Sequence, residues 1–161
     1  MPVKHTIEPS AIGRLRIAYV VHTFDVGGLE RIVAHLVNHL DPARFWPMVI
    51  CLERSGGAAQ WIRREDVPIV ELHKPPGNSL RIVGQLARVL REYRIDLIHT
   101  HNWGTLLEST LARRRTKGVR HVHAEHGLEL DEFRVRGWKR QVRRLAMGWS
   151  LRRADAVVAI A

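Results

Sequence analysis

The chain has 161 residues, and its 26 Lys and Arg against 16 Asp and Glu give a formal net charge of +10. Its apolar fraction of 45% excludes a disordered chain, and its length is sufficient for one domain with a buried core. The single cysteine excludes an internal disulfide, and the absence of an apolar run of ~20 residues or of a signal-peptide pattern leads us to expect a cytoplasmic protein.

Short runs rich in β-branched residues alternate with segments of helical periodicity. The first strand is expected over 16–22, followed by a helix in which apolar residues recur at three- and four-residue steps from Leu29 to Leu40. Asp41-Pro42 ends this helix, because a residue before proline disfavours the helical conformation. Further strands are expected at 47–52, 67–72, 95–100, 119–124 and 156–160, and helices at 58–64, 79–93, 105–115 and 135–153.

This alternation predicts an α/β fold with a doubly wound, Rossmann-like parallel sheet in the strand order 3-2-1-4-5-6. We expect residues 1–15 to be an N-terminal extension and residues 16–161 to form a single domain. The last strand is expected to be buried. The helix that would cover it is missing from the sequence.

In open parallel sheets, ligands bind beyond the carboxyl ends of the strands, where the strand order reverses. That rule singles out the loops 23–28, 101–104 and 125–128. In the first loop, Gly27 and Gly28 allow close approach of a ligand and present backbone N–H groups at a helix start, which favours a phosphate or sugar. A simple tight turn is the alternative.

Histidines are concentrated near the ends of two predicted strands. His99 and His101 share one face of their strand, as do His121 and His123 of theirs, and His126 follows in the next loop. A zinc site is the less favoured interpretation, because a third ligand would have to come from elsewhere. We expect His121 and His123 to be buried structural residues and His126 to belong to the site.

The charge is concentrated near the C-terminus, where residues 113–161 hold 13 basic and 5 acidic residues. The predicted helix there carries an apolar stripe and a basic face. We expect the stripe to pack on the sheet and the basic face to attract an anionic membrane surface. The stripe comprises Val135, Trp138, Val142, Leu145 and Trp149, and the basic face comprises Arg136, Lys139, Arg140, Arg143 and Arg144.

Several of these motifs together resemble the N-terminal domain of family-4 glycosyltransferases. They are the runs 24–30 (Phe-Asp-Val-Gly-Gly-Leu-Glu), 99–102 (His-Thr-His-Asn) and 124–127 (Ala-Glu-His-Gly), and the passage from Ser55-Gly56-Gly57 to Val67-Pro68-Ile69. The stretch 72–77 (Leu-His-Lys-Pro-Pro-Gly) resembles the subgroup associated with exopolysaccharide and PEP-CTERM/exosortase gene clusters. The resemblance covers about residues 16–160.

The resemblance implies one half of a GT-B enzyme that transfers a hexose from a nucleotide-sugar donor to a lipid-linked or saccharide acceptor, with retention and without a metal or other cofactor. It implies that Gly27 and Gly28 lie near the donor phosphates and that His126 stabilises charge at the reacting centre. His101, Asn102 and Glu125 are then expected on the acceptor side, although the subgroup has Arg where His101 stands.

In this family the second domain carries two glutamates with seven residues between them, and no such pair is suitably placed here. We therefore expect a truncated chain, inactive alone, that acts in the cytoplasm or on the inner face of the plasma membrane. Three alternatives stay open. They are an NAD-type domain with Glu53 as the ribose ligand, a basic nucleic-acid binder that lacks a recognised motif, and half of a GT-B epimerase.

Overall fold

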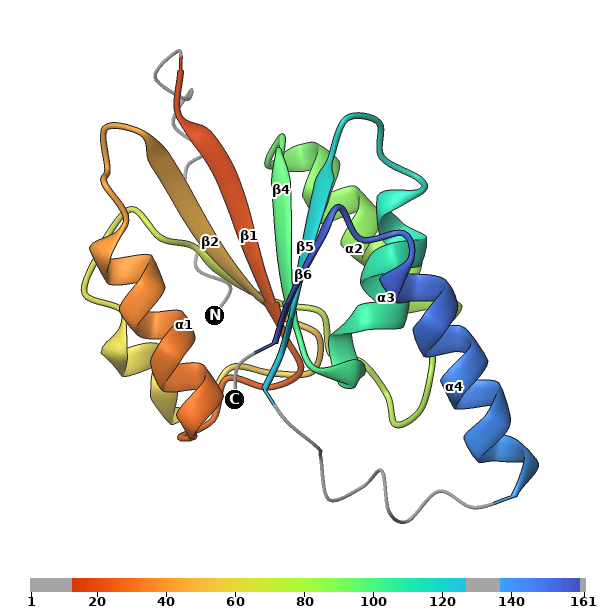
Figure 1. Cartoon of the computed structure of the whole chain (residues 1–161). Helices are drawn as coiled ribbons and strands as arrows, with labels where there is room; N and C mark the ends of the chain where they lie inside the picture. The colour runs from red at the N-terminus through yellow and green to blue at the C-terminus, as the bar shows by residue number, and fades with distance from the viewer. Residues whose placement is uncertain (1–12, 127–136, 160–161) are drawn as a thin grey trace.

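A computed structural model describes residues 13–126 and 137–159 of the chain. Within these ranges the chain forms a six-stranded parallel sheet in the order β3-β2-β1-β4-β5-β6, as predicted (Figure 1). The strands are β1 (Leu15–Val21), β2 (Phe45–Cys51), β3 (Ile69–Glu71), β4 (Leu97–His101), β5 (Arg120–Glu125) and β6 (Ala156–Ala159). The helices are α1 (Gly28–His39), the 3-10 helix η1 (Gly57–Trp61), α2 (Leu80–Glu92), α3 (Trp103–Arg113) and α4 (Trp138–Leu151).

The sheet separates two apolar cores, because successive side chains of β1 point to opposite faces. Ile17, Tyr19 and Val21 pack with α1, whereas Ala18 and Val20 pack with α2. β1 lies between β2 and β4 and is buried on both faces, which explains its nearly continuous apolar sequence.

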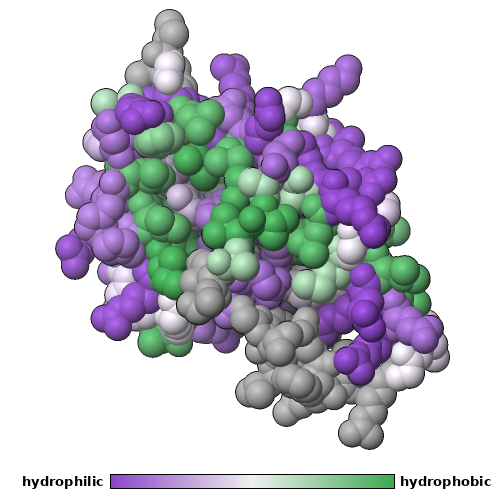
Figure 2. Space-filling view, viewed as in Figure 1, coloured by the Kyte–Doolittle hydropathy of each residue, from purple (hydrophilic) through white to green (hydrophobic). Residues whose placement is uncertain are grey.

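The two halves of the sheet are covered differently. α1 lies over β1 and β2, and α2 and α3 cover the opposite face (Figure 1). Among the described residues, no helix covers the α1-side face of β5 and β6, and Figure 2 shows an apolar area there. All four residues of β6 are exposed, so the expectation of a buried last strand is wrong: within the described part of the chain, β6 is an edge strand that pairs with β5 alone.

The basic helix also differs from the prediction. α4 packs mainly against α3, and Trp138, Val142 and Leu145 are exposed rather than packed on the sheet. The periodicity correctly gave one apolar face, but amphipathicity does not say what covers that face. Val135 and Arg136 lie outside the described residues.

Other departures are small. β1 begins at Leu15, one residue inside the expected N-terminal extension. The helix expected at 58–64 is instead the shorter 3-10 helix η1. In the part of the chain that the structure describes, no helix is long and apolar enough to span a bilayer.

Candidate functional site

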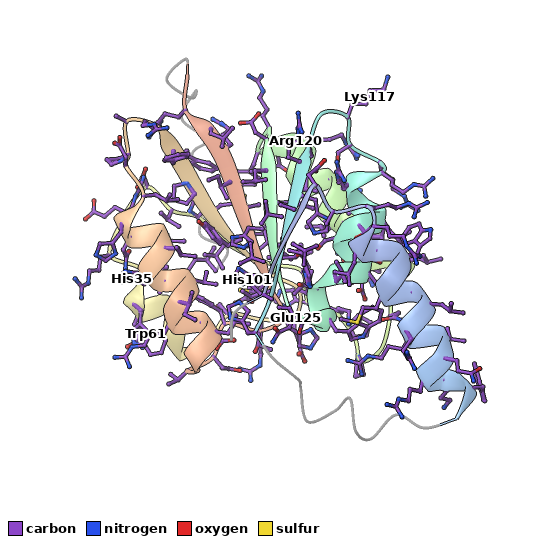
Figure 3. All side chains as sticks on the ribbon, viewed as in Figure 1. His35, Trp61, His101, Lys117, Arg120 and Glu125 are labelled. Carbon is purple, nitrogen blue, oxygen red and sulfur yellow. The ribbon has the colours of Figure 1, made fainter. Side chains whose placement is uncertain are left out.

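The candidate site lies at the carboxyl ends of β1 and β4, where the strand order reverses. A cavity of about 290 Å³ opens there between the first turns of α1 and α3. In Figure 3, His101 lies near the carboxyl end of β4, at the centre of the molecule. The cavity is lined by His22, Thr23, Leu29, Glu30, His101, Asn102, Trp103, Gly104 and Arg143.

The glycine loop is held in place by Phe24, which is fully buried beneath it. The backbone N–H of Phe24 donates to the Arg54 carbonyl at 3.2 Å, and the Ala58 N–H donates to the Phe24 carbonyl at 3.2 Å. These bonds tie the start of α1 to the segment after β2. The loop is therefore a fixed scaffold for the first turn of α1.

Gly27 precedes α1 as its N-cap and Gly28 is its first residue, and no side chain caps this helix start. A Cβ atom on Gly27 would collide with the Glu30 carboxylate, whereas one on Gly28 would meet no atom within 4 Å. At Gly27, the absence of a side chain makes room for Glu30 of the same chain. At Gly28, no protein atom needs that room. The surface beside Gly28 is open to a ligand.

Glu30 brings a carboxyl group to the cavity from the first turn of α1. Burial raises its pKa, and the nearby Asp25 carboxylate acts in the same direction, although a backbone hydrogen bond opposes the shift. A carboxylate at a helix N-terminus is favoured by the helix dipole, so Glu30 occupies the position that suits an anion.

His101 ends β4 and is only 3% exposed. Its backbone N–H donates to the Thr105 hydroxyl at 3.0 Å, and that hydroxyl donates to the His101 carbonyl at 2.8 Å. Burial, followed by the nearby His99, lowers the pKa of His101 to about 2, so its imidazole is neutral at physiological pH.

His126 is joined to β4 by two contacts. Its Nε2 lies 2.9 Å from Nδ1 of His101, and its backbone N–H donates to Oδ1 of Asn102 at 2.9 Å. Asn102 adopts a positive φ of 57° and donates its own N–H to the Ala124 carbonyl at 3.0 Å. Asparagine tolerates this conformation better than most residues, and it links the ends of β4 and β5.

The structure thus brings His101, Asn102 and His126 together, and of these His101 and Asn102 line the cavity beside the first turn of α1. Glu125 is placed differently: its Oε2 lies 3.4 Å from Nε2 of the buried His123. Of the predicted basic face, Arg143 reaches the cavity and lies 5.2 Å from the ring centroid of Trp103, whereas Lys139, Arg140 and Arg144 are exposed on α4.

The buried-histidine prediction is confirmed for His121 and His123. Both are fully buried, and the Thr100 hydroxyl lies 2.8 Å from a ring nitrogen of each. His99 shares a face with His101, and their ring centroids are 4.4 Å apart. Within residues 13–126 and 137–159, no three His, Cys, Asp or Glu side chains are grouped to hold a metal ion.

Sequence reasoning did not single out His22 or Glu30 among the cavity residues, and it did not predict that Arg143 contacts Trp103. His22 lies just past β1, with its Nε2 3.4 Å from the carboxylate of Glu53, the residue weighed above as a ribose ligand. The position of His22 and Glu30 beside the Gly-Gly pair was the available signal. The Trp103–Arg143 contact joins two helices that are distant in the sequence, so no local sequence pattern predicts it.

Comparison with known proteins agrees with this arrangement. Residues 26–161 match the sequence profile described as Glycosyltransferase Family 4. The chain belongs to this family. A comparison with curated protein sequences found no significant match.

Solved structures show the same fold. Sucrose-phosphate synthase from Thermosynechococcus elongatus superposes with a TM-score of 0.61 at 16% identity, covering 89% of this chain and 42% of that one. A glycosyltransferase from Rickettsia africae superposes with a TM-score of 0.57 at 18% identity, covering 75% of this chain and 33% of that one. The UDP-GlcNAc 2-epimerase of Neisseria meningitidis superposes with a TM-score of 0.53 at 16% identity, covering 91% of this chain and 39% of that one. The family-4 chain therefore spans about two fifths or less of the length of these relatives.

Proposed function

We propose that this family-4 domain is the N-terminal, acceptor-side half of a retaining sugar transferase that uses a nucleotide-sugar donor and a lipid-linked or saccharide acceptor. The observation that carries the proposal is the placement of His126, His101 and the start of α1 around one end of the sheet. The stretch 72–77 supports assignment to the exopolysaccharide subgroup.

The chemistry follows from the charge that develops during transfer. When the bond between sugar and nucleotide breaks, the diphosphate gains negative charge, and N–H groups at the start of α1 beside Gly28 can stabilise it. The raised pKa of Glu30 favours its neutral form and so eases the approach of this anion. If the neutral His101 donates from Nδ1 to His126 Nε2, the proton of a neutral His126 lies on Nδ1. His126 could then donate a hydrogen bond to an oxygen of the transferring sugar.

The acceptor is assigned to the α3 side of the cavity. Asn102, Trp103 and Gly104 line that side and present an amide, an aromatic ring and a residue without a side chain. We expect the nucleotide to be held by a second Rossmann-like domain, and we expect the 161-residue chain alone to be inactive. Within the proposal no step requires a metal ion or another cofactor.

The test is transfer from a panel of UDP-, GDP- and ADP-sugars to lipid and polysaccharide fractions, with and without EDTA. The chain alone is compared with the protein joined to a family-4 C-terminal domain. We expect transfer by the joined protein only, in both conditions. Turnover by the chain alone would refute its assignment as half an enzyme, and interconversion of UDP-sugars without transfer would identify an epimerase.

A further inference from the structure

Three residues of the apolar stripe on α4 are left uncovered by the described part of the chain. Trp138, Val142 and Leu145 lie at helical spacing on one face and are 70%, 54% and 74% exposed. Among the residues that the structure describes, they are three of the nine large apolar side chains that are exposed. Leaving three such groups in water on one helix face is costly, so the stripe points to a partner.

Charge distinguishes α4 from an ordinary surface helix. The helix contains four basic residues and no acidic one. Lys139 and Arg144 lie on either side of the stripe, and the Lys139 ammonium is 6.0 Å from the Trp138 ring. At the other end, Trp149 lies beneath the guanidinium groups of Arg153, at 4.1 Å, and Arg114, at 5.7 Å.

The two ends of α4 are held differently. At the C-terminal end, Ser150 is fully buried, and Arg113 of α3 pairs with Asp155 at 2.8 Å just beyond the helix. The N-terminal half extends away from the body of the domain (Figure 1). Every residue of 138–145 is exposed except the half-buried Arg143, so this half is presented to solvent.

We propose that α4 docks in the plane of an anionic lipid bilayer, with Trp138, Val142 and Leu145 inserted among the acyl chains and its exposed cations Lys139, Arg140 and Arg144 on the headgroups. A helix of 14 residues is too short to span a bilayer, whereas an apolar stripe with flanking cations and an aromatic residue is typical of interfacial helices. A nucleic acid would use the cations and leave the stripe exposed. A second copy would bring like charges together.

This docking would place the candidate site near the lipid surface. Arg143, which is on α4, lines the cavity and contacts Trp103. A cavity attached to a membrane-bound helix suits an acceptor carried on a lipid, an extension that rests on the proposed function. Docking itself does not depend on that function, because it can be measured without turnover.

The experiment is cosedimentation of the full chain with vesicles of phosphatidylcholine alone or with 30% phosphatidylglycerol, at low and high salt. We expect at least tenfold stronger binding to the anionic vesicles, and quenching of tryptophan fluorescence by lipids brominated along their acyl chains. W138S/L145S should lose binding at least tenfold and lose the quenching, whereas K139E/R144E should lose only the preference for anionic lipid.

Two matched controls are available on α2. Leu80 is 74% exposed, as Leu145 is, and Arg88 is exposed, so L80S and R88E should bind as the wild type does. All substituted side chains are exposed, and an unchanged melting temperature confirms folding. The proposal is overturned if the chain does not bind anionic vesicles or if L80S weakens binding as much as W138S/L145S. RNA binding that W138S/L145S leaves intact, without vesicle binding, would also overturn it.

Discussion

His101 and His126 differ in their surroundings although their ring nitrogens are 2.9 Å apart. His101 is almost fully buried, whereas His126 is only partly buried at the end of β5. Burial lowers the pKa of His126 too, but the nearby Glu125 carboxylate opposes the shift. The two residues therefore suit different tasks: His101 holds the ring of His126 in place, and His126 remains available to a ligand.

Replacing His126 by Ala tests the second task. In the protein joined to its second domain, we expect H126A to lower kcat by about 10² or more, because a donor to the developing charge is removed. The backbone bond to Asn102 remains, but the buried Nδ1 of His101 loses its partner, so a modest fall in melting temperature should accompany the loss of turnover. H73A is the control, because His73 is exposed and distant from His126 in the sequence. Near-normal turnover of H126A would exclude His126 from the site.

Buried neutral histidines make the stability of the domain depend on pH. Burial lowers the pKa of His101 to about 2 and that of His121 to about 3, whereas an unfolded imidazole titrates near 6.5. The stabilisation is complete above about pH 6.5 and is lost as pH falls toward the folded-state values, since the unfolded chain binds more protons. Each residue should contribute about 1.4 kcal/mol per pH unit in that window.

Urea unfolding at pH 7.5, 6 and 5 measures this dependence. The free energy of unfolding should fall steeply between pH 6 and pH 5, and H121Q should show a shallower slope. A free energy that is constant from pH 7.5 to pH 5 would contradict the assignment of buried neutral imidazoles.

The connection from β4 to α3 depends on one hydroxyl. Thr105 is fully buried, and its Oγ1 accepts from the His101 N–H and donates to the His101 carbonyl. T105V should lower the free energy of unfolding by about 1–3 kcal/mol, because a buried N–H loses its acceptor. T105S keeps the hydroxyl and should retain most of that energy in denaturant titrations. A T105V variant as stable as T105S would contradict a dominant contribution from the hydroxyl.

A buried ion pair joins the loop after β3 to α3. Nζ of Lys74 lies 3.6 Å from Oε1 of Glu108, and the side chains are only 7% and 4% exposed. K74M should destabilise the domain by about 3–5 kcal/mol, since it leaves a buried carboxylate without its cation. K74M/E108L should recover much of this loss. A double variant as unstable as K74M, measured by urea unfolding, would argue against the ion pair as the cause.

Most of the strands and helices could be predicted from the sequence, but the surfaces that they leave exposed could not. Periodicity and β-branched runs were sufficient for the strands and helices, and the doubly wound fold then gave the strand order and correctly brought 101–102 and 126 to one edge. The exposure of the α4 stripe could not be predicted, because it depends on which surfaces the neighbouring elements leave open. The same holds for the place of Glu30 in the cavity and for the contact between Arg143 and Trp103, which depend on how α1, α3 and α4 pack together.

At the scale of the whole molecule, the protection of the sheet should be uneven. β1 is paired on both sides, and its residues Ala18–Val21 are buried, whereas in the described chain β6 is paired on one side and all four of its residues are exposed. β3 is the other edge strand, but its residues are half-buried. Exposure and edge position can therefore be separated by comparing the three strands.

Native-state hydrogen exchange makes this comparison. Paired amides of β1 should exchange only through global unfolding, while those of β6 should open locally and exchange at least ~10²-fold faster. β3 should be intermediate, because its edge position exposes its backbone while its side chains still pack. If β6 exchanged as slowly as β1, its apolar face would be covered in solution. If β3 exchanged as fast as β6, edge position alone would set the protection, and the exposed face of β6 would have no part in it.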